Sequence, residues 1–261
     1  MVFLKTDDEI ELIKKSAQVL GKAHAEVAKL IRPGITTAAL DKRAYEYIKD
    51  NGGIPSFKGY NGFPYTLCVS VNEQVVHGMP GQYELKEGDV VSIDCGVILN
   101  GFHSDSAYTY PVGQIDEKVA ALLKSTKESL YKGINEAVAG NRTGDIGFAI
   151  QSYVEERGYS VVRELVGHGI GKSLHEAPEV PNYGKRGKGY KLQEGVVLAI
   201  EPMVNMGKKQ VVTEKDGWTI RTADRLPSAH FEHTVVVRKG KAELLTTFEF
   251  IEKVETIDQV K

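Results

Sequence analysis

Cysteine, long apolar runs and an excess of charge of one sign are scarce or missing in this sequence. Cys68 and Cys95 are its two cysteines, so no disulfide framework is expected and a reducing, cytoplasmic location is indicated. No apolar run reaches the ~18 residues of a membrane-spanning helix, and the charged start MVFLKTDDEIELIKKS lacks the apolar core of a signal peptide. The 33 Lys and Arg nearly balance the 35 Asp and Glu, which excludes the basic surface typical of nucleic-acid binding.

The remaining composition is typical of a globular protein. The 261 residues are 41% hydrophobic and 26% charged, which excludes a disordered chain and suffices for a substantial core. No low-complexity linker divides the sequence, so we expect a single domain over residues 1–261. Glycine is enriched, since 27 residues exceed the usual ~7%. Because glycine lets the backbone approach a neighbour closely, this enrichment indicates a crowded site.

Helical and extended segments are grouped rather than alternating. Thr6 and the acids after it begin a helix whose apolar spacing continues to Pro33. Further helices are expected at 37–49, 116–139 and 143–158, and strands at 89–99, 102–111, 161–166, 196–200 and 234–238. This order of helices, strands, helices and strands predicts an α+β fold rather than alternating β-α-β units.

The second half of the sequence echoes the first. The glycine-bounded segment 34–52 matches 140–158 at a constant offset of 106 residues, and Leu85–Asp94 matches Leu192–Glu201 at an offset of 107. An acidic residue closes the apolar run in both copies. We therefore predict two half-domains, about 10–111 and 116–240, related by pseudo-two-fold symmetry inside one domain.

Asn100-Gly101 predicts a two-residue hairpin turn that sets the register of the strands on either side. Asp105 then faces Gly96, two residues along the strand from Asp94. Both aspartates therefore leave the same sheet face as diagonal neighbours, roughly 7 Å apart at the backbone. Two carboxylates that converge after an apolar run are costly unless a cation lies between them. A solvated sheet face is the alternative.

Two more carboxylates and a histidine occur in similar settings. Glu201 ends an apolar strand, Glu232 begins one, and His168 lies in a Gly-His-Gly-Ile-Gly loop, where an ordinary surface position is the alternative. With Asp94 and Asp105 they form an oxygen-rich set with one imidazole, which suits Mn²⁺, Fe²⁺ or Co²⁺, with Zn²⁺ as a further choice. Two such ions acidify a shared water and so provide a nucleophile near neutral pH. The residues thus indicate a two-metal hydrolase.

Several longer motifs resemble those of the type I methionine aminopeptidases, metallopeptidases with the "pita-bread" fold. The resemblance covers about residues 5–252 and rests on Cys68-Val-Ser-Val-Asn-Glu-Gln-Val-Val-His77-Gly, Asp94 with Asp105, Gly167-His168-Gly-Ile-Gly, Leu174-His175-Glu-Ala-Pro, Ile200-Glu201-Pro-Met and Phe231-Glu232-His-Thr. It implies duplicated half-domains whose antiparallel sheet is covered by helices. No zinc-binding extension precedes Met1 and no long helical insertion follows, so the short bacterial-type form is expected.

The resemblance implies a role for each of the five proposed metal ligands. Asp105 and Glu232 would bridge two divalent ions. Asp94 would complete one site, while His168 and Glu201 would complete the other.

Three residues receive catalytic roles from the same resemblance. His175 would polarise the scissile carbonyl as an oxyanion donor, and His77 would contact the scissile amide nitrogen and assist proton transfer. Glu201 would carry the proton of the attacking water. For both histidines, a hydrogen-bonded structural role is the alternative.

The resemblance also implies a pocket for the methionine side chain, whose thioether favours apolar and aromatic surroundings. Its residues would be Phe57, Tyr60, Phe63, Cys68, Leu174 and Trp218. Plain core packing is the alternative for Phe57 and Leu174. Common family members often have cysteine, histidine, tyrosine and phenylalanine where this chain has Phe57, Asn61, Phe63 and Leu174. We expect these exchanges to change the pocket's shape and to keep methionine selectivity.

The activity implied is hydrolytic removal of the initiator methionine from nascent chains whose second residue is small. We expect a monomer that binds peptides with an N-terminal methionine and does not bind membranes. Its basic loop 184–191 is either a solvated surface or a contact with the ribosome. A monovalent cation near Asn72, Gln74 and Ser228 is also implied. The alternatives are a prolidase or Xaa-Pro aminopeptidase and a non-catalytic binding protein of this fold, but the aromatic slot argues against the former and the complete ligand set against the latter.

Overall fold

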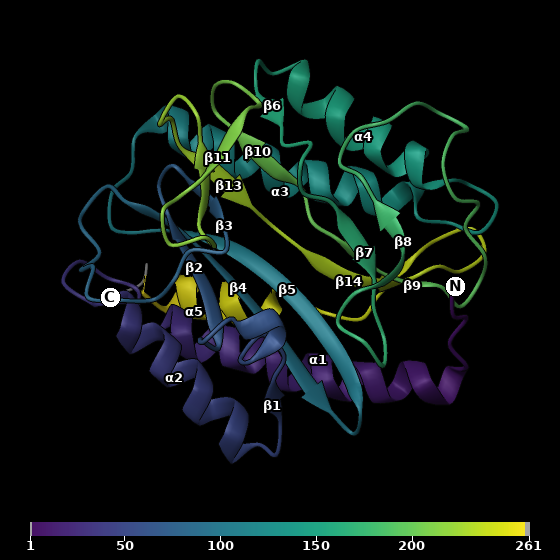
Figure 1. Cartoon of the computed structure of the whole chain (residues 1–261), viewed down its shortest axis with the longest axis horizontal. Helices are drawn as coiled ribbons and strands as arrows, with labels where there is room; N and C mark the ends of the chain where they lie inside the picture. Colours follow the sequence, from purple (N-terminus) through teal and green to yellow (C-terminus); the bar gives the residue numbers. More distant parts are fainter. Residues whose placement is uncertain (1, 259–261) are drawn as a thin grey trace.

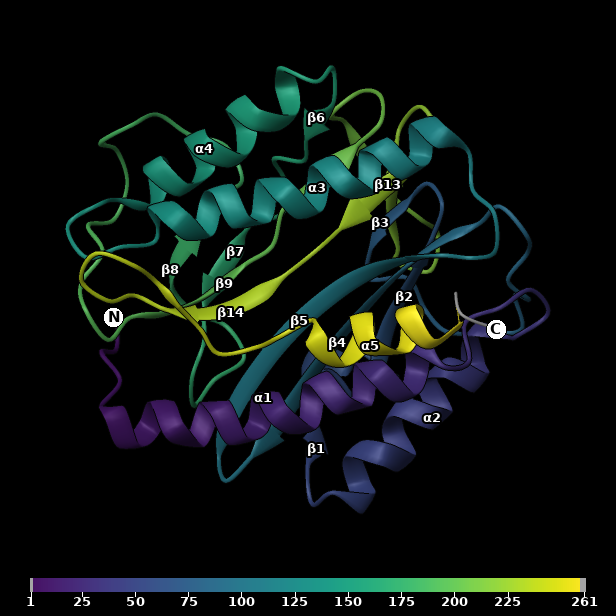
Figure 2. The same ribbon diagram turned by 180° about the vertical axis from the view of Figure 1, so that it is seen from behind.

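The computed structural model describes residues 2–258, with side chains up to residue 254, and combines helices with antiparallel sheets (Figure 1). The α-helices of this described part are α1 (Asp7–Ala28), α2 (Thr37–Asp50), α3 (Glu117–Glu136), α4 (Thr143–Glu155) and α5 (Glu249–Asp258). Seen from behind, α1, α3, α4 and α5 lie in front of the strands, so these helices cover one side of the sheets (Figure 2). None of the described helices is both long and apolar enough to cross a membrane.

Two larger sheets carry the polar residues singled out above. The first sheet has the order β1-β4-β2, with β5 also paired to β4, and consists of β1 (Ile54–Pro55), β2 (Leu67–Val71), β4 (Val90–Leu99) and β5 (Phe102–Pro111). The second has the order β15-β14-β9-β7-β8 and consists of β7 (Gly167–Gly169), β8 (Glu176–Val180), β9 (Val197–Ile200), β14 (His233–Val236) and β15 (Glu243–Leu244). Within both sheets, the strands named here pair in antiparallel fashion.

Two three-stranded sheets flank the larger ones. Their orders are β13-β10-β6 and β11-β12-β3. Their strands are β3 (Gln74–Val76), β6 (Ser160–Val161), β10 (Met203–Asn205), β11 (Val211–Thr213), β12 (Ile220–Thr222) and β13 (Ser228–His230), and a short 3-10 turn, η1, spans Tyr60–Gly62.

A seam joins the larger sheets between β5 and the segment 230–234. The Thr234 hydroxyl accepts the Asp105 N–H at 3.1 Å and donates to the Asp105 carbonyl at 2.8 Å. In the same way, the Thr109 hydroxyl accepts the His230 N–H at 2.9 Å and donates to the His230 carbonyl at 2.8 Å. The Glu232 N–H donates to a β5 carbonyl at 2.9 Å. These bonds satisfy buried backbone groups, and they fix Asp105 and Glu232 beside each other.

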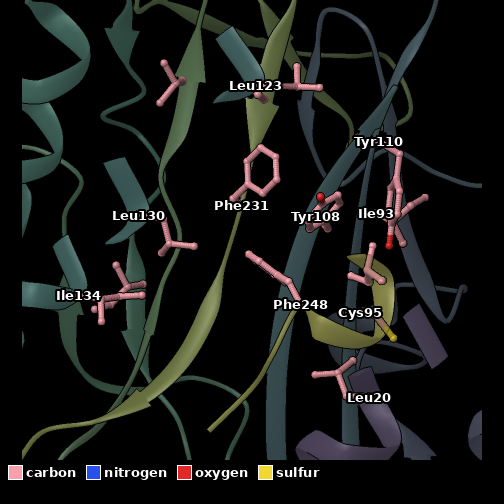
Figure 3. Packing of buried hydrophobic residues seen from close by; sticks show 14 of the residues in the cluster. Leu20, Ile93, Cys95, Tyr108, Tyr110, Leu123, Leu130, Ile134, Phe231 and Phe248 are labelled. Atoms are coloured by element: carbon pink, nitrogen blue, oxygen red, sulfur yellow. The ribbon is translucent and has the colours of Figure 1, made fainter. Parts of the chain in front are cut away.

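Aromatic packing supports this seam from the helix side. Tyr108 on β5, Phe231 in the seam and Phe248 before α5 pack edge to face, with ring centroids 4.9 to 6.2 Å apart. Leu20 of α1 and Ile93 of β4 belong to the same buried cluster (Figure 3). Because a close-packed interior tolerates little movement, the strands that bear the polar residues are held rigidly.

The structure confirms the predicted hairpin, including its register, in which Gly96 pairs with Asp105. The predicted first helix is too long, because turn-type hydrogen bonds at Leu30 and Ile31 follow its end at Ala28, before Pro33. The expected strand at 161–166 is wrong beyond residue 161, since residues 164–166 line a cavity instead of pairing. Helix α5 was not predicted.

Candidate metal centre and substrate pocket

A cavity of about 640 Å³ brings together every residue predicted for the site. The predicted ligands, histidines and pocket residues that line it are Asp94, Asp105, His168, Glu201, Glu232, His77, His175, Phe57, Tyr60, Phe63, Cys68, Leu174 and Trp218. They come from both larger sheets and from loops, and His77 and Trp218 adjoin strands of the β11-β12-β3 sheet. The cavity therefore lies where the two halves of the sequence meet.

The acidic residues and His168 converge at one end of this cavity. Asp105, His168 and Glu232 offer ligand atoms that all lie within 4.8 Å of one another. His168 Nε2 lies 3.6 Å from Glu201 Oε1, and Asp94 shares a sheet face with Asp105. The other ring nitrogen of His168 donates to a backbone carbonyl at 2.9 Å, which directs the Nε2 lone pair toward the acids.

Burial shifts the pKa of each of these groups away from its ordinary value. It raises the pKa of Asp94 to about 7 and that of Glu201 to about 8. It also raises the pKa of Asp105 and Glu232 well above the usual range, with the neighbouring acids adding to the effect. Burial lowers the pKa of His168 to about 3, so its imidazole is neutral. Each shift reflects charge that has been taken out of water.

The cluster fits divalent metal ions. Asp94 Oδ1 and Glu232 Oε1 are buried without a hydrogen-bond donor among the described residues. None of the described residues that line the cavity is a Lys or an Arg. A buried carboxylate without a donor or cation is costly. Carboxylate oxygens with one neutral imidazole form the donor set that Mn²⁺, Fe²⁺, Co²⁺ or Zn²⁺ accepts.

The two predicted catalytic histidines both line this cavity. The Tyr60 hydroxyl lies at hydrogen-bond distance from His175 Nδ1, at 2.8 Å. With the tyrosine as donor, the proton of the neutral imidazole lies on Nε2, which can then donate it to a substrate. The His175 ring also packs edge to face on His168 at 4.3 Å. His77 follows β3 with a positive φ of 57°. Burial lowers the pKa of His175 and lowers that of His77 to about 4.

The predicted pocket residues form an apolar slot beside the acids. Phe63 packs edge to face against Trp218 at 5.2 Å. Phe57, Cys68 and Leu174 are buried in the same cluster. In the β2–β4 pairing Cys68 lies directly opposite Asp94, so the slot adjoins the proposed metal ligands. These side chains belong to the core and also line the cavity.

The N-terminal segment is tied to the strand that follows His175. Lys5 forms an ion pair with Glu176, and the two side chains are only 5% and 6% exposed. Glu176 also accepts the Ser173 N–H at 3.2 Å. At Gly171 an added Cβ would lie 2.5 Å from the Lys5 side chain, so glycine makes room for the pair.

Replacing Lys5 by Met is expected to lower the free energy of unfolding by about 3–5 kcal/mol, because it leaves the Glu176 carboxylate buried without its cation. Chemical denaturation of the purified proteins measures the change. The double variant Lys5→Met/Glu176→Gln should recover most of the loss. A single variant as stable as one at the exposed Lys42 would contradict the assignment.

The residues proposed for a monovalent cation lie apart from the acids. The Ser228 N–H donates to the Asn72 carbonyl at 3.0 Å, and Gln74 accepts the Val71 N–H with its side chain at 2.9 Å. Asn72 and Gln74 line a separate hollow of about 190 Å³. The cation itself remains a prediction.

Sequence reasoning missed one histidine at the metal centre. His230 Nε2 lies 3.5 Å from Glu201 Oε2. Its place two residues before Glu232 was the available signal, since residues two apart in extended chain point to the same side. The link between Tyr60 and His175 was also missed, because 115 residues separate them.

Comparisons with known proteins agree with this site. The sequence profile of metallopeptidase family M24 matches residues 11–239. The chain belongs to this family of metal-dependent peptidases. Within the family it groups with the methionine aminopeptidases: that of Clostridium perfringens is 55% identical over 94% of this chain and 99% of its own length, and methionine aminopeptidase 1 of Bacillus subtilis is 51% identical over 94% and 99%.

Solved structures give the same grouping. The crystal structure of methionine aminopeptidase from Thermotoga maritima matches with a TM-score of 0.93 and 46% identity, covering 95% of this chain and all of that one. The prolidase from Pyrococcus furiosus matches with a TM-score of 0.78 and 24% identity over 94% of this chain and 66% of its own, which shows a shared fold alone. The predictions of a pita-bread fold and of a metallo-aminopeptidase are confirmed.

Proposed function

We propose that this enzyme removes the N-terminal methionine from polypeptides whose second residue is small. One observation carries the proposal: a single cavity joins the buried cluster of acids and imidazole to the apolar slot of Phe63 and Trp218. The slot suits a thioether side chain. A peptide that places its first side chain there presents its first peptide bond to the acids.

The five clustered residues Asp94, Asp105, His168, Glu201 and Glu232 would hold two divalent ions. Four carboxylates balance the charge of two such ions, and the oxygen-rich set favours Mn²⁺, Fe²⁺ or Co²⁺, with Zn²⁺ as a further choice. When bound, ions in such a site polarise a carbonyl and make water nucleophilic near neutral pH.

The side chains of the enzyme would supply orientation and proton transfer. His175 donates from Nε2 to the scissile carbonyl oxygen while negative charge develops there. His77 assists the proton transfer to the amide nitrogen that leaves. Glu201 accepts a proton from the attacking water on its carboxylate, which burial makes a better base than an exposed acid. Burial of these groups strengthens each interaction by excluding bulk water.

An assay on three peptides tests the proposal. Metal-supplemented enzyme should release methionine from Met-Gly-Met-Met, release far less from Met-Leu-Met-Met, and leave Gly-Pro intact. Cleavage of Gly-Pro without release of methionine would instead identify a prolidase-like enzyme.

His175→Ala is expected to lower kcat for Met-Gly-Met-Met by about 10²–10³-fold, the usual cost of removing an oxyanion donor. KM should change little, because the interaction forms mainly in the transition state. Steady-state kinetics measures both constants. Tyr60→Phe keeps the imidazole and should cost less, so equal losses in the two variants would argue against direct donation by His175.

Several finer points belong to the same proposal. Methionine removal from new chains is a step of protein maturation in the cytoplasm, and we propose that the enzyme acts there as a monomer, with loop 184–191 available to the ribosome. The monovalent cation near Asn72, Gln74 and Ser228 would brace the turn between β2 and β3. The half-domains 10–111 and 116–240 would derive from one duplicated unit, because α2 and α4 begin at equivalent positions, Thr37 and Thr143.

A further inference from the structure

His230 is a buried histidine whose imidazole has no hydrogen bond to any described residue. The residue is 1% exposed, and neither ring nitrogen has a hydrogen-bond partner among the described residues. Buried polar side chains are nearly always paired, and a neutral imidazole has one donor and one acceptor to satisfy. This imidazole therefore needs a partner inside the protein.

The backbone of His230 is held by hydrogen bonds to two neighbouring strands. The hydroxyl of Thr109, on β5, accepts the His230 N–H and donates to the His230 carbonyl. On the other side, His230 pairs with Met203 between strands β13 and β10. The backbone of His230 is thus fixed on both sides, and its ring lies beside the acids, with Nε2 3.5 Å from Glu201 Oε2. The titratable groups that interact electrostatically with the His230 ring are Asp94, Glu201 and His77.

Glu201 lies between two imidazoles. Its Oε1 is 3.6 Å from His168 Nε2, and its Oε2 is 3.5 Å from His230 Nε2. The two rings differ in what fixes their protons. His168 donates from Nδ1 to a carbonyl, which leaves its Nε2 without a proton. The His230 ring nitrogens have no hydrogen-bond partner among the described residues, and Nε2 faces the Glu201 carboxylate. An ionised carboxylate can only accept a hydrogen bond, so beside Glu201 in its ionised form His230 carries its proton on Nε2.

We propose that His230 is a positioning residue of the metal centre, which donates from Nε2 to Glu201 Oε2 and orients this carboxylate for its ion. A small closing movement converts the separation of 3.5 Å into a hydrogen bond of ordinary length. One oxygen of Glu201 is then fixed, and the other is directed toward the side of His168. Groups that hold a metal ligand in this way commonly change metal affinity about 10–100-fold when removed.

The proposal rests on the metal centre of the proposed function, and its test is separate from peptide cleavage. Isothermal titration of chelator-treated protein with Mn²⁺ measures the affinity of each equivalent. His230→Leu should bind one of two equivalents about 10–100-fold more weakly. His230→Gln keeps a neutral N–H donor and should bind within about threefold of the parent protein.

His233→Gln is the matched control. It makes the same chemical change three residues away, at a buried ring that bonds Thr246 and Tyr131 instead of an acid, and its Mn²⁺ affinities should equal those of the parent. His230→Leu with unchanged affinities would overturn the proposal. A His230→Gln variant as weak as His230→Leu would also overturn it, since direct ligation of the ion would then explain the loss. If His230→Leu does not fold, His230→Gln and His230→Asn decide by the same comparison of affinities.

Discussion

Replacing Asp105 by Asn is expected to abolish peptide hydrolysis and at the same time to stabilise the metal-free protein. The carboxylate is buried among other acids, and burial raises its pKa well above the ordinary range. Asn has the same shape and keeps an oxygen for the Ser106 N–H but carries no charge for an ion. Loss of several kcal/mol of electrostatic stabilisation corresponds to at least ~10³-fold in kcat.

The stability of the same variant should change in the opposite direction. In chelator, Asp105→Asn removes one of four acids whose ionisation the fold disfavours, so the free energy of unfolding should rise by more than ~1 kcal/mol at pH 8. Urea denaturation with and without Mn²⁺ measures both effects. Asp50→Asn, at an exposed acid that ends α2, controls for the loss of a charge in general. A metal-free Asp105→Asn protein less stable than the parent would show that buried charge is not what destabilises the metal-free site.

The stability that the protein loses on metal removal is expected to depend strongly on pH. Chelation should cost little stability at pH 5 and much more at pH 8. In the folded metal-free protein the pKa of Asp94 is about 7 and that of Glu201 about 8, whereas both acids ionise near pH 4 once unfolded. A pKa raised by folding gives stability that is present below the unfolded value and is lost as the pH rises through the folded value. Each such acid therefore removes up to about 1.4 kcal/mol per pH unit between these limits.

Comparison of Mn²⁺-loaded and chelated protein isolates this contribution. Buried His24 and His233 have pKa values lowered to about 4 and about 3, so they destabilise both forms equally as the pH falls below 6.5, and they cancel in the difference. The difference in unfolding free energy should grow steadily from pH 5 to pH 8, and Asp94→Asn should make it grow less. A difference that is constant over this range would contradict the electrostatic account.

The elements nearest the site were predictable because local rules define them. Asn100-Gly101 sets a two-residue turn, and the turn sets the register, so the shared face of Asp94 and Asp105 followed from the sequence. The capping residue Thr6 and the acids after it marked the start of α1. Where the prediction failed, at residues 162–166, the half-buried apolar residues Leu165 and Val166 line the cavity, and a short apolar run of this kind reads in the sequence like a strand.

Motif spacing predicted which side chains form the site, while their mutual arrangement depends on contacts between distant segments. The seam joins Asp105 to Thr234 across 129 residues, and Lys5 meets Glu176 across 171. No periodicity or turn preference reaches so far, because both depend on neighbours along the chain.

The hairpin, the acid-bearing strands and the candidate ligand set could be predicted from the order of residues alone. The fold was needed to show which histidines are neutral, which carboxylates lack a donor, and that His230 lies beside Glu201. The physical reason is that charge state and hydrogen-bond satisfaction depend on what surrounds a group in three dimensions. That surrounding is assembled only when the two halves of the chain pack together.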